Sequence, residues 1–217
     1  MSGKVPLGLY LHVPFCRSKC PYCDFYSFRG DEAQMDRYCA ALSQKISESA
    51  KAYNRKADTL YIGGGTPSFL GADRLCALIN QAKQSFLLPN AEITVECNPY
   101  KLPPDFFEKL QEAGVNRVSI GLQSAVDEER RALGRLSDRA GVEKAVLAAQ
   151  KAGVPKISLD VMLGVPKQTE KSLAETLSFC LSLGVGHVSA YILKLEENTY
   201  FYTHRDTLQL PDDDQTA

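Results

Sequence analysis

Six short apolar segments that alternate with helical stretches constrain the fold of this chain more than any other feature of its sequence. The apolar segments occupy residues 7–13, 58–62, 92–97, 117–121, 156–163 and 187–193. Amphipathic spacing predicts helices between them, at residues 31–54, 73–87, 103–113, 127–152 (with a break near 136–138) and 171–183. Strands that alternate with helices form parallel sheets with right-handed crossovers. The sequence therefore predicts an α/β fold with a six-stranded parallel sheet.

Such a sheet is either open and doubly wound or part of a TIM-like barrel, a partial (β/α)6 barrel. Gly114, Gly153 and Gly184 follow three of the predicted helices and mark where the chain turns toward the next strand. In both architectures the carboxyl ends of the strands meet at one edge, where ligands bind. The residues that follow each strand are therefore the first candidates for a functional site.

The composition favours a globular, cytoplasmic protein. Among 217 residues, 25 Lys and Arg nearly balance 26 Asp and Glu, so no basic field favours a nucleic-acid partner. No apolar run reaches the roughly 20 residues of a transmembrane segment. The apolar N-terminal stretch lacks a small-residue cleavage site, which indicates a first strand rather than a signal peptide. Seven cysteines without an export signal are more typical of metal ligands or small buried side chains than of disulfides.

We expect one core domain at residues 1–204, followed at residues 205–217 by the start of a linker or helix. The polar end of the chain reads LPDDDQTA, and Pro211 with Asp212 suits the first turn of a helix. The sequence stops before such a helix could cover the sixth strand. We therefore expect the chain to be a fragment of a longer protein whose C-terminal domain is missing.

Three cysteines directly after the first predicted strand form the most specific motif. Cys16, Cys20 and Cys23 follow the spacing C-x3-C-x2-C, so three thiolates can converge on one centre. A structural zinc site usually has four ligands in two short pairs, and no second pair lies nearby. A [4Fe-4S] cluster held by only three cysteines leaves one iron open to a substrate. This motif favours an iron–sulfur cluster, with zinc or free thiols as the alternatives.

Glycines and polar residues follow the other strands at the same edge. Gly63-Gly64-Gly65-Thr66 ends the second strand, where glycines let the backbone approach a ligand closely, although a plain turn also uses glycine. Glu96 ends the third strand, where a carboxylate either accepts bonds from ribose hydroxyls or faces solvent. The remaining candidates are Gln123 after the fourth strand, Arg135 in the loop that follows, and Asp160 within the fifth strand.

The cysteine motif and its flanks resemble the signature of the radical S-adenosylmethionine (SAM) superfamily. The matching residues are Tyr10-x-His12-x-Pro14-Phe15-Cys16-x3-Cys20-x-Tyr22-Cys23. The resemblance implies a radical SAM core, a partial (β/α)6 barrel in which three cysteines hold a [4Fe-4S] cluster whose fourth iron chelates SAM. It also implies one-electron cleavage of SAM to a 5′-deoxyadenosyl radical, for which the protein supplies position and exclusion of water. A dehydrogenase would instead have G-x-G-x-x-G at the first turn.

Within this superfamily the chain is similar to the branch of oxygen-independent coproporphyrinogen III oxidases and heme chaperones of the HemW type. This resemblance implies SAM contacts at Tyr10, Tyr22, Gly64, Gly65, Thr66, Glu96, Gln123, Arg135 and Asp160. It further implies heme or a porphyrin as ligand and an electron donor such as a flavodoxin or ferredoxin. A heme-accepting protein would be a further partner. No residue is assigned a catalytic role.

Three features favour the chaperone over the oxidase. Oxidases of this branch carry a fourth cysteine two residues after the third, whereas Cys23 is followed by Asp24-Phe25-Tyr26-Ser27. They also have an N-terminal extension, for which this chain leaves no room because it begins nine residues before Tyr10. The stretches at residues 195–199 and 210–214 are similar to the chaperones. The resemblance thus predicts a heme chaperone that binds a cluster and SAM, with coproporphyrinogen oxidation as the alternative.

Overall fold

One parallel sheet organises the fold in the computed structural model, which describes residues 7–211. Its strands are β1 (Gly8–Val13), β2 (Ala57–Gly64), β3 (Leu87–Cys97), β4 (Arg117–Gln123), β5 (Lys156–Leu163) and β6 (His187–Ile192). They lie side by side in chain order, and every neighbouring pair is parallel. The α/β class and the six parallel strands predicted from the sequence are confirmed.

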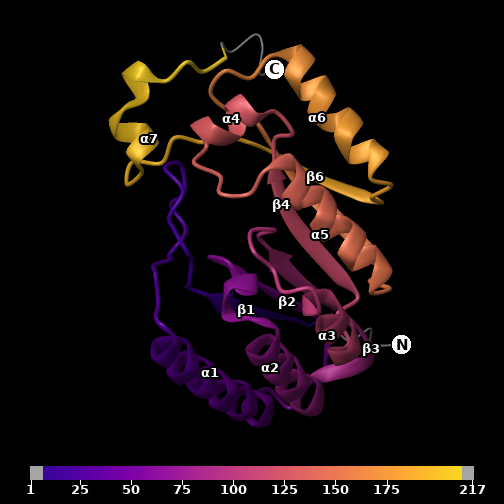
Figure 1. Cartoon of the computed structure of the whole chain (residues 1–217). Coiled ribbons are helices and arrows are strands. Elements are labelled where there is room, and N and C mark those ends of the chain that lie inside the picture. Colours follow the sequence, from indigo (N-terminus) through magenta and orange to yellow (C-terminus); the bar gives the residue numbers. More distant parts are fainter. Residues whose placement is uncertain (1–6, 212–217) are drawn as a thin grey trace, which may run out of the picture.

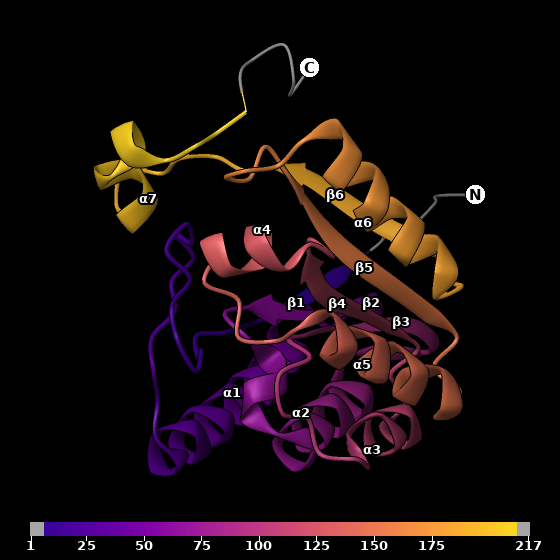
Figure 2. The ribbon, with the colours of Figure 1, turned by 45° about the horizontal axis from the view of Figure 1, so that its top comes forward.

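Helices separate the strands. They are α1 (Glu32–Tyr53), α2 (Ala72–Ser85), α3 (Phe106–Ala113), α4 (Asp127–Ala132), α5 (Arg139–Lys151), α6 (Glu170–Ser182) and α7 (Tyr200–Thr203), with short 3-10 helices η1 (Pro67–Leu70) and η2 (Arg205–Thr207). Figures 1 and 2 show the five longer helices α1, α2, α3, α5 and α6 outside the curved sheet, whereas α4 and α7 lie beyond the strand ends. None of these helices has the length and apolar character that a bilayer crossing requires, as far as the chain is described.

The strand order decides between the two architectures that the sequence leaves open. A doubly wound sheet reverses its strand order at a switch point, but here each strand pairs with the next one from β1 to β6. Within residues 7–211, β1 pairs only with β2 and β6 only with β5, so the barrel does not close. The structure is therefore the partial (β/α)6 barrel.

The two faces of the sheet differ in chemistry because side chains alternate along a strand. Val95, Val118 and Leu159 point to the helical side and are fully buried in the main core. Residues of the opposite parity are polar, and the register places Glu96 beside Ser119 and Asp160 beside Ser189. A complete TIM barrel fills its centre with bulky branched side chains. Here the concave face carries polar residues instead, and small ones such as Ser119 and Ser189 do not fill the centre.

Element boundaries follow local chemistry. Asp31 caps α1 because its side chain accepts a bond from the Gln34 backbone amide at 2.7 Å, and the Gln34 side-chain oxygen accepts one from the Asp31 backbone amide at 2.9 Å. The predicted break near residues 136–138 is confirmed by the end of α4 and the start of α5. The prediction of helix to residue 87 is wrong, because Pro89 cannot continue a helix and β3 already begins at Leu87. The helix start expected at Asp212 lies outside the described residues, and the division at residue 204 stays a prediction.

Truncating a buried and an exposed leucine should test which helix residues form the core. Leu75 on α2 is fully buried, whereas Leu181 on α6 is 79% exposed. We expect Leu75→Ala to lower the free energy of unfolding by about 2–5 kcal/mol, because it leaves a cavity between α2 and the sheet. The matched Leu181→Ala should change it by less than about 0.5 kcal/mol. Urea unfolding measures both, and equal losses would contradict the assignment of Leu75 to the core and Leu181 to the surface.

Candidate functional site

A cavity of about 710 Å³ lies at the carboxyl ends of the strands. The predicted site residues that line it are Cys16, Cys20, Tyr22, Cys23, Gly64, Gly65, Thr66, Glu96, Gln123, Arg135 and Asp160. Tyr10 is the exception, because its side chain is 55% exposed on β1 and its hydroxyl lies 3.1 Å from His12 Nδ1. Its ring stacks on Tyr61, which does line the cavity, with centroids 6.1 Å apart. The fold thus gathers residues that are far apart in the sequence.

The loop between β1 and α1 carries the three cysteines. Its base is closed by backbone bonds from Cys16 N to Phe28 O at 3.0 Å and from Phe28 N to Pro14 O at 2.9 Å. Inside the loop, Cys23 N donates to Cys20 O at 3.1 Å. All three thiols are free and partly buried, and burial is the main reason that the pKa of Cys23 is raised. The loop therefore presents three unpaired thiols to one cavity.

The glycines after β2 bring this loop and the sheet together. Gly65 N donates to Val13 O at 2.7 Å, and the Thr66 hydroxyl lies 3.2 Å from Cys16 Sγ. A Cβ added at Gly65 would lie 2.8 Å from Phe15 O and 3.1 Å from Cys16 Sγ. Gly64 has a backbone φ of +113°, which residues other than glycine rarely adopt. The turn therefore needs glycine because the backbone approaches the cysteine loop closely.

Two carboxylates face the cavity from β3 and β5. Glu96 accepts bonds from the Tyr61 hydroxyl at 2.7 Å and from the Gly64 amide at 3.2 Å, while Asp160 accepts one from the Ser119 hydroxyl at 2.8 Å. Burial raises the pKa of both carboxyl groups, and these hydrogen bonds oppose the shift. Desolvation disfavours two negative charges in one cavity. A cationic group bound between them would compensate for that cost.

Arg135 supplies a positive charge on the other side of the cavity. Its guanidinium donates to Gly121 O at 3.0 Å and lies 4.0 Å from Cys20 Sγ, while its buried Nε has no hydrogen-bond partner within the described chain. Gln123 ends β4 with φ +70° and accepts a bond from the Tyr191 hydroxyl at 2.5 Å. Left-handed conformations of non-glycine residues gather at functional sites. Arg135 and Gln123 are thus held at the cavity by the ends of β4 and β6 and by the loop after α4.

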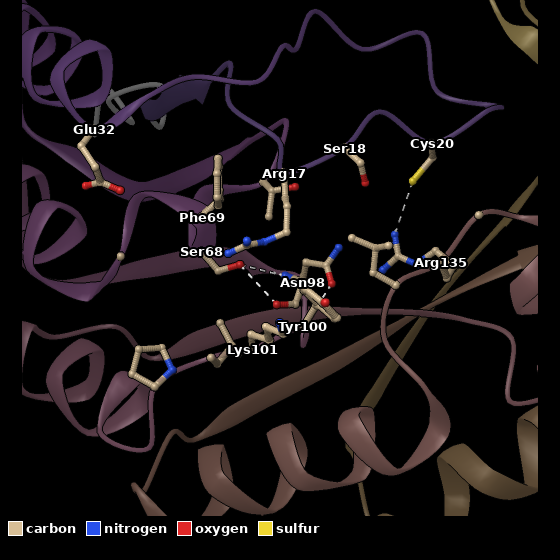
Figure 3. Close-up of a pocket in the computed structure, with 16 residues that line it drawn as sticks. Arg17, Ser18, Cys20, Glu32, Ser68, Phe69, Asn98, Tyr100, Lys101 and Arg135 are labelled. Carbon is tan, nitrogen blue, oxygen red and sulfur yellow. Dashed lines mark hydrogen bonds between the residues drawn. The ribbon is translucent and has the colours of Figure 1, made fainter.

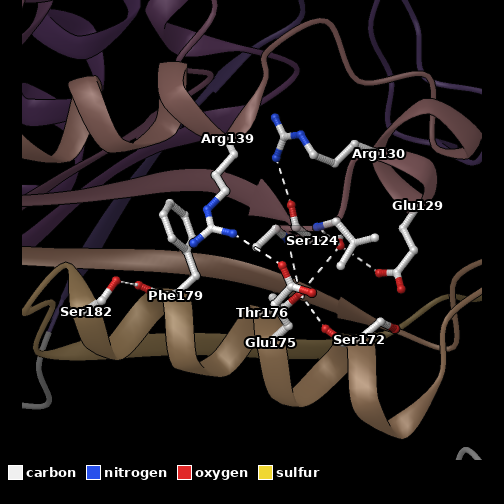
Figure 4. A network of polar contacts seen from close by, with 11 residues as sticks. Ser124, Glu129, Arg130, Arg139, Ser172, Glu175, Thr176, Phe179 and Ser182 are labelled. Carbon is white, nitrogen blue, oxygen red and sulfur yellow. Dashed lines mark hydrogen bonds and ion pairs between the residues drawn. The ribbon is translucent and has the colours of Figure 1, made fainter.

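A buried polar network fixes the loop that carries Arg135 (Figure 4). The Arg130 guanidinium donates to Leu122 O at 3.0 Å, to Ser124 O at 2.8 Å and to Ser137 O. Burial lowers the pKa of Arg130 to about 10. The Arg135 amide in turn donates to Arg130 O at 3.0 Å. The network therefore joins the end of β4 to the loop of Arg135.

The same network reaches α6. The Ser124 hydroxyl donates to Glu129 at 2.6 Å and lies 3.5 Å from the Thr176 hydroxyl. Thr176 also accepts the Ala125 amide at 3.1 Å. The turn after β4 is thus held from two helices, α4 and α6.

Comparison with known proteins decides the family. The sequence profile of the Radical SAM superfamily matches residues 10–180 of this chain. The chain belongs to the radical SAM superfamily. The profile spans β1 to most of α6 and includes every cysteine of the C-x3-C-x2-C motif.

Individual relatives lie in the heme-related part of this superfamily. The chain is 36% identical to the heme chaperone HemW of Mycobacterium tuberculosis (strain ATCC 25618 / H37Rv), over 100% of this chain and 57% of that protein. It is 37% identical to HemW of Escherichia coli (strain K12), over 96% and 56%. The chain therefore spans about half the length of the curated relatives that it matches.

Solved structures agree with the fold. The coproporphyrinogen III oxidase HemN from Escherichia coli, described as a radical SAM enzyme, superimposes with a TM-score of 0.88 at 29% identity and covers 97% of this chain and 50% of HemN. Methylornithine synthase superimposes with a TM-score of 0.65 at 17% identity, a likeness of fold alone. The HemN match extends over nearly the whole described barrel.

The residues of this radical SAM barrel fit the two groups that the superfamily implies, a [4Fe-4S] cluster and SAM. Within residues 7–211, no three His, Cys, Asp or Glu side chains gather closely enough to hold a single metal ion. A cluster binds each thiolate to a different iron, so its ligands need to face one cavity rather than one point. SAM carries an ammonium, a sulfonium, a carboxylate and hydroxyls. Glu96 and Asp160 suit its cationic groups and hydroxyls, and the unpaired Arg135 Nε suits its carboxylate.

Sequence reasoning missed several polar residues of the cavity wall, among them Tyr61, Ser119, Ser189 and Tyr191. The strand period could have found two of them. Ser119 lies two residues before Gly121 on β4, and Tyr61 lies two residues before Gly63 on β2, so each shares a strand face with a residue at the site edge. Polar residues at every second position of an otherwise apolar strand indicate a polar face. Tyr22 packs against Phe201 of α7 with ring centroids 6.1 Å apart, a contact that spacing along the sequence does not reveal.

The glycine turn yields one prediction. Gly65→Ala should displace the cysteine loop, because its Cβ would lie within 3.1 Å of Cys16 Sγ and closer still to Phe15 O. We expect the affinity for iron during anaerobic reconstitution to fall at least about tenfold, as it does for other changes beside a metal site. Gly186→Ala is the control, since its Cβ would meet nothing within 4 Å. Wild-type iron binding by Gly65→Ala would show that the turn does not shape the site.

The buried side chain of Arg130 yields a second prediction. Arg130→Met should remove the guanidinium that donates to three buried carbonyl groups and lower the free energy of unfolding by about 3 kcal/mol, since a buried acceptor left unsatisfied costs about 1–3 kcal/mol. Its neighbour Arg131 is exposed on the same helix, so Arg131→Met should cost less than about 0.5 kcal/mol. Thermal and urea unfolding compare the two variants. Similar stabilities would mean that the network of Figure 4 contributes little.

Proposed function

We propose that Cys16, Cys20 and Cys23 hold a [4Fe-4S] cluster that binds SAM at its open iron. The observation that carries this proposal is that the three thiols and the polar strand ends line one cavity. The cysteine loop follows β1 directly and is tied to the turn after β2 by the bond from Gly65 N to Val13 O. The membership in the radical SAM superfamily supports the same assignment.

In this proposal SAM extends along the strand ends. The backbone of Gly64, Gly65 and Thr66 and the guanidinium of Arg135 bind its amino acid part, and Glu96, Gln123 and Asp160 bind its hydroxyl and amino groups. Tyr22 lines the cavity beside this path, whereas Tyr10 is linked to it only through Tyr61, on which its ring stacks. When bound, the reduced cluster supplies the electron that cleaves SAM. The chain itself orients the cofactor through the polar groups that line the cavity.

We further propose that the chain is the radical SAM portion of a HemW-type heme chaperone that takes part in heme trafficking in the cytoplasm. This proposal is supported by identities of 36–37% to HemW proteins over nearly the whole chain. It is also supported by Asp24-Phe25-Tyr26-Ser27 after Cys23, where the oxidases have a further cysteine. Its partners would be heme, a flavodoxin or ferredoxin as electron donor, and a heme-accepting protein.

Oxygen-independent coproporphyrinogen III oxidation is the second candidate. The TM-score of 0.88 to HemN supports it, because the barrels are alike over 97% of this chain. The two functions differ in a direct assay. A chaperone binds heme and leaves coproporphyrinogen III unchanged in the presence of SAM and reductant, whereas an oxidase decarboxylates it.

The cluster assignment is tested by single cysteine variants. Cys20→Ala should abolish the electron paramagnetic resonance signal of the dithionite-reduced, reconstituted chain, because only two thiol ligands would remain. Cys76→Ala is the matched control, since this half-buried thiol on α2 lies outside the cavity and donates to Lys109 O. A four-iron signal in Cys20→Ala equal to that of the wild type would rule out the assignment.

A further inference from the structure

A second recess lies beside the cysteine loop, next to the main cavity. It has a volume of about 220 Å³ and is bounded by the cysteine loop, η1, the segment after β3 and the loop of Arg135. Ser18, Cys20, Thr66, Asn98 and Arg135 line both this recess and the main cavity. The recess and the main cavity therefore adjoin each other, and Cys20 is reached from both.

Two cations without ion-pair partners border the recess. Figure 3 shows Arg17 pointing between Phe69 and the segment of Asn98 and Tyr100. Its guanidinium lies 5.2 Å from the Phe69 ring and 5.7 Å from the Tyr100 ring, and Lys101 Nζ lies 5.2 Å from the Tyr100 ring. Within residues 7–211, neither Arg17 nor Lys101 takes part in a salt bridge. The aromatic rings hold both charges in place.

The rest of the rim suits a protein partner. Glu32, the acidic residue of the rim, is already paired with Arg74 at 2.7 Å. Leu136 lies at the edge of the recess and is 47% exposed. An apolar contact beside unpaired cations is typical of small, transient interfaces that are steered by charge. An acidic partner would complement this rim.

Electron delivery needs such a second approach. The main cavity would hold SAM, so a protein that docks there would have to displace the cofactor. The recess also reaches Cys20, a proposed cluster ligand, while Arg17 and Lys101 line the recess and not the cavity. Arg17 and Ser18 belong to the cysteine loop itself. A partner seated on the recess therefore lies against the loop that carries the cluster.

We propose that this recess is the docking surface for an acidic ferredoxin that reduces the cluster, a proposal that rests on the [4Fe-4S] assignment made above. One electron leaves the reduced iron–sulfur centre of the ferredoxin, which is oxidised, and enters the [4Fe-4S] cluster, which is reduced. No bond forms or breaks and no proton moves. Arg17 and Lys101 bind carboxylates of the ferredoxin and orient it toward Cys20.

The test measures cluster reduction by a reduced plant-type ferredoxin in anaerobic stopped flow. The rate constant for the wild type should fall steeply between about 0.05 and 0.5 M salt, because screening weakens the attraction of the partners. Arg17→Glu combined with Lys101→Glu should lower it about tenfold or more at low salt. The matched control combines Lys144→Glu on α5 with Lys171→Glu on α6, two exposed lysines away from the recess.

The control should reduce at the wild-type rate although its net charge changes equally. Dithionite should reduce the cluster of all variants to the same extent, which separates docking from cluster assembly. Lys101→Glu alone lies outside the cysteine loop, so its effect does not depend on that loop's folding. Unchanged rates in the recess variants, or a rate that ignores salt, would overturn the docking proposal alone. A wild-type chain without a cluster signal under dithionite would overturn the cluster assignment and the docking proposal together.

Discussion

The alternation of side chains along six parallel strands is the constraint on which the rest of this structure depends. One parity, represented by Val95, Val118 and Leu159, is apolar and buries the helices against the sheet. The other parity turns Glu96 and Asp160 toward the concave side. Because the carboxyl ends of parallel strands share one edge, the polar parity and the loops converge there. Stability and site formation are therefore carried by opposite faces of the same strands.

The close contact of two loops then shapes the site. The cysteine loop is closed by its own backbone bonds and joined to the turn after β2 by Gly65 and Thr66, so the positions of the thiols are set by backbone rather than by long side chains. Arg135 approaches Cys20 from a third loop, which Arg130 anchors to the end of β4. The recess beside Arg17 lies against this loop and also reaches Cys20.

Sequence periodicity predicted the strands, most helix limits and the cysteine motif, since these depend on local patterns. It could not choose between a doubly wound sheet and a partial barrel, because both contain the same alternating elements and differ only in strand order. It also extended the second helix through Leu87, where tertiary pairing with Ala57 makes a strand instead. Tyr61 and Tyr191 were missed because their importance lies in contacts with Glu96 and Gln123, which are distant in sequence.

The central claim is that the three cysteines leave one iron of a four-iron cluster open to SAM. Mössbauer spectroscopy of the reconstituted ⁵⁷Fe chain tests it most directly, because it distinguishes individual irons within a cluster. One iron of the four should change its isomer shift when SAM is added, while the other three keep theirs. A four-iron spectrum that is identical with and without saturating SAM would contradict an open iron that binds SAM.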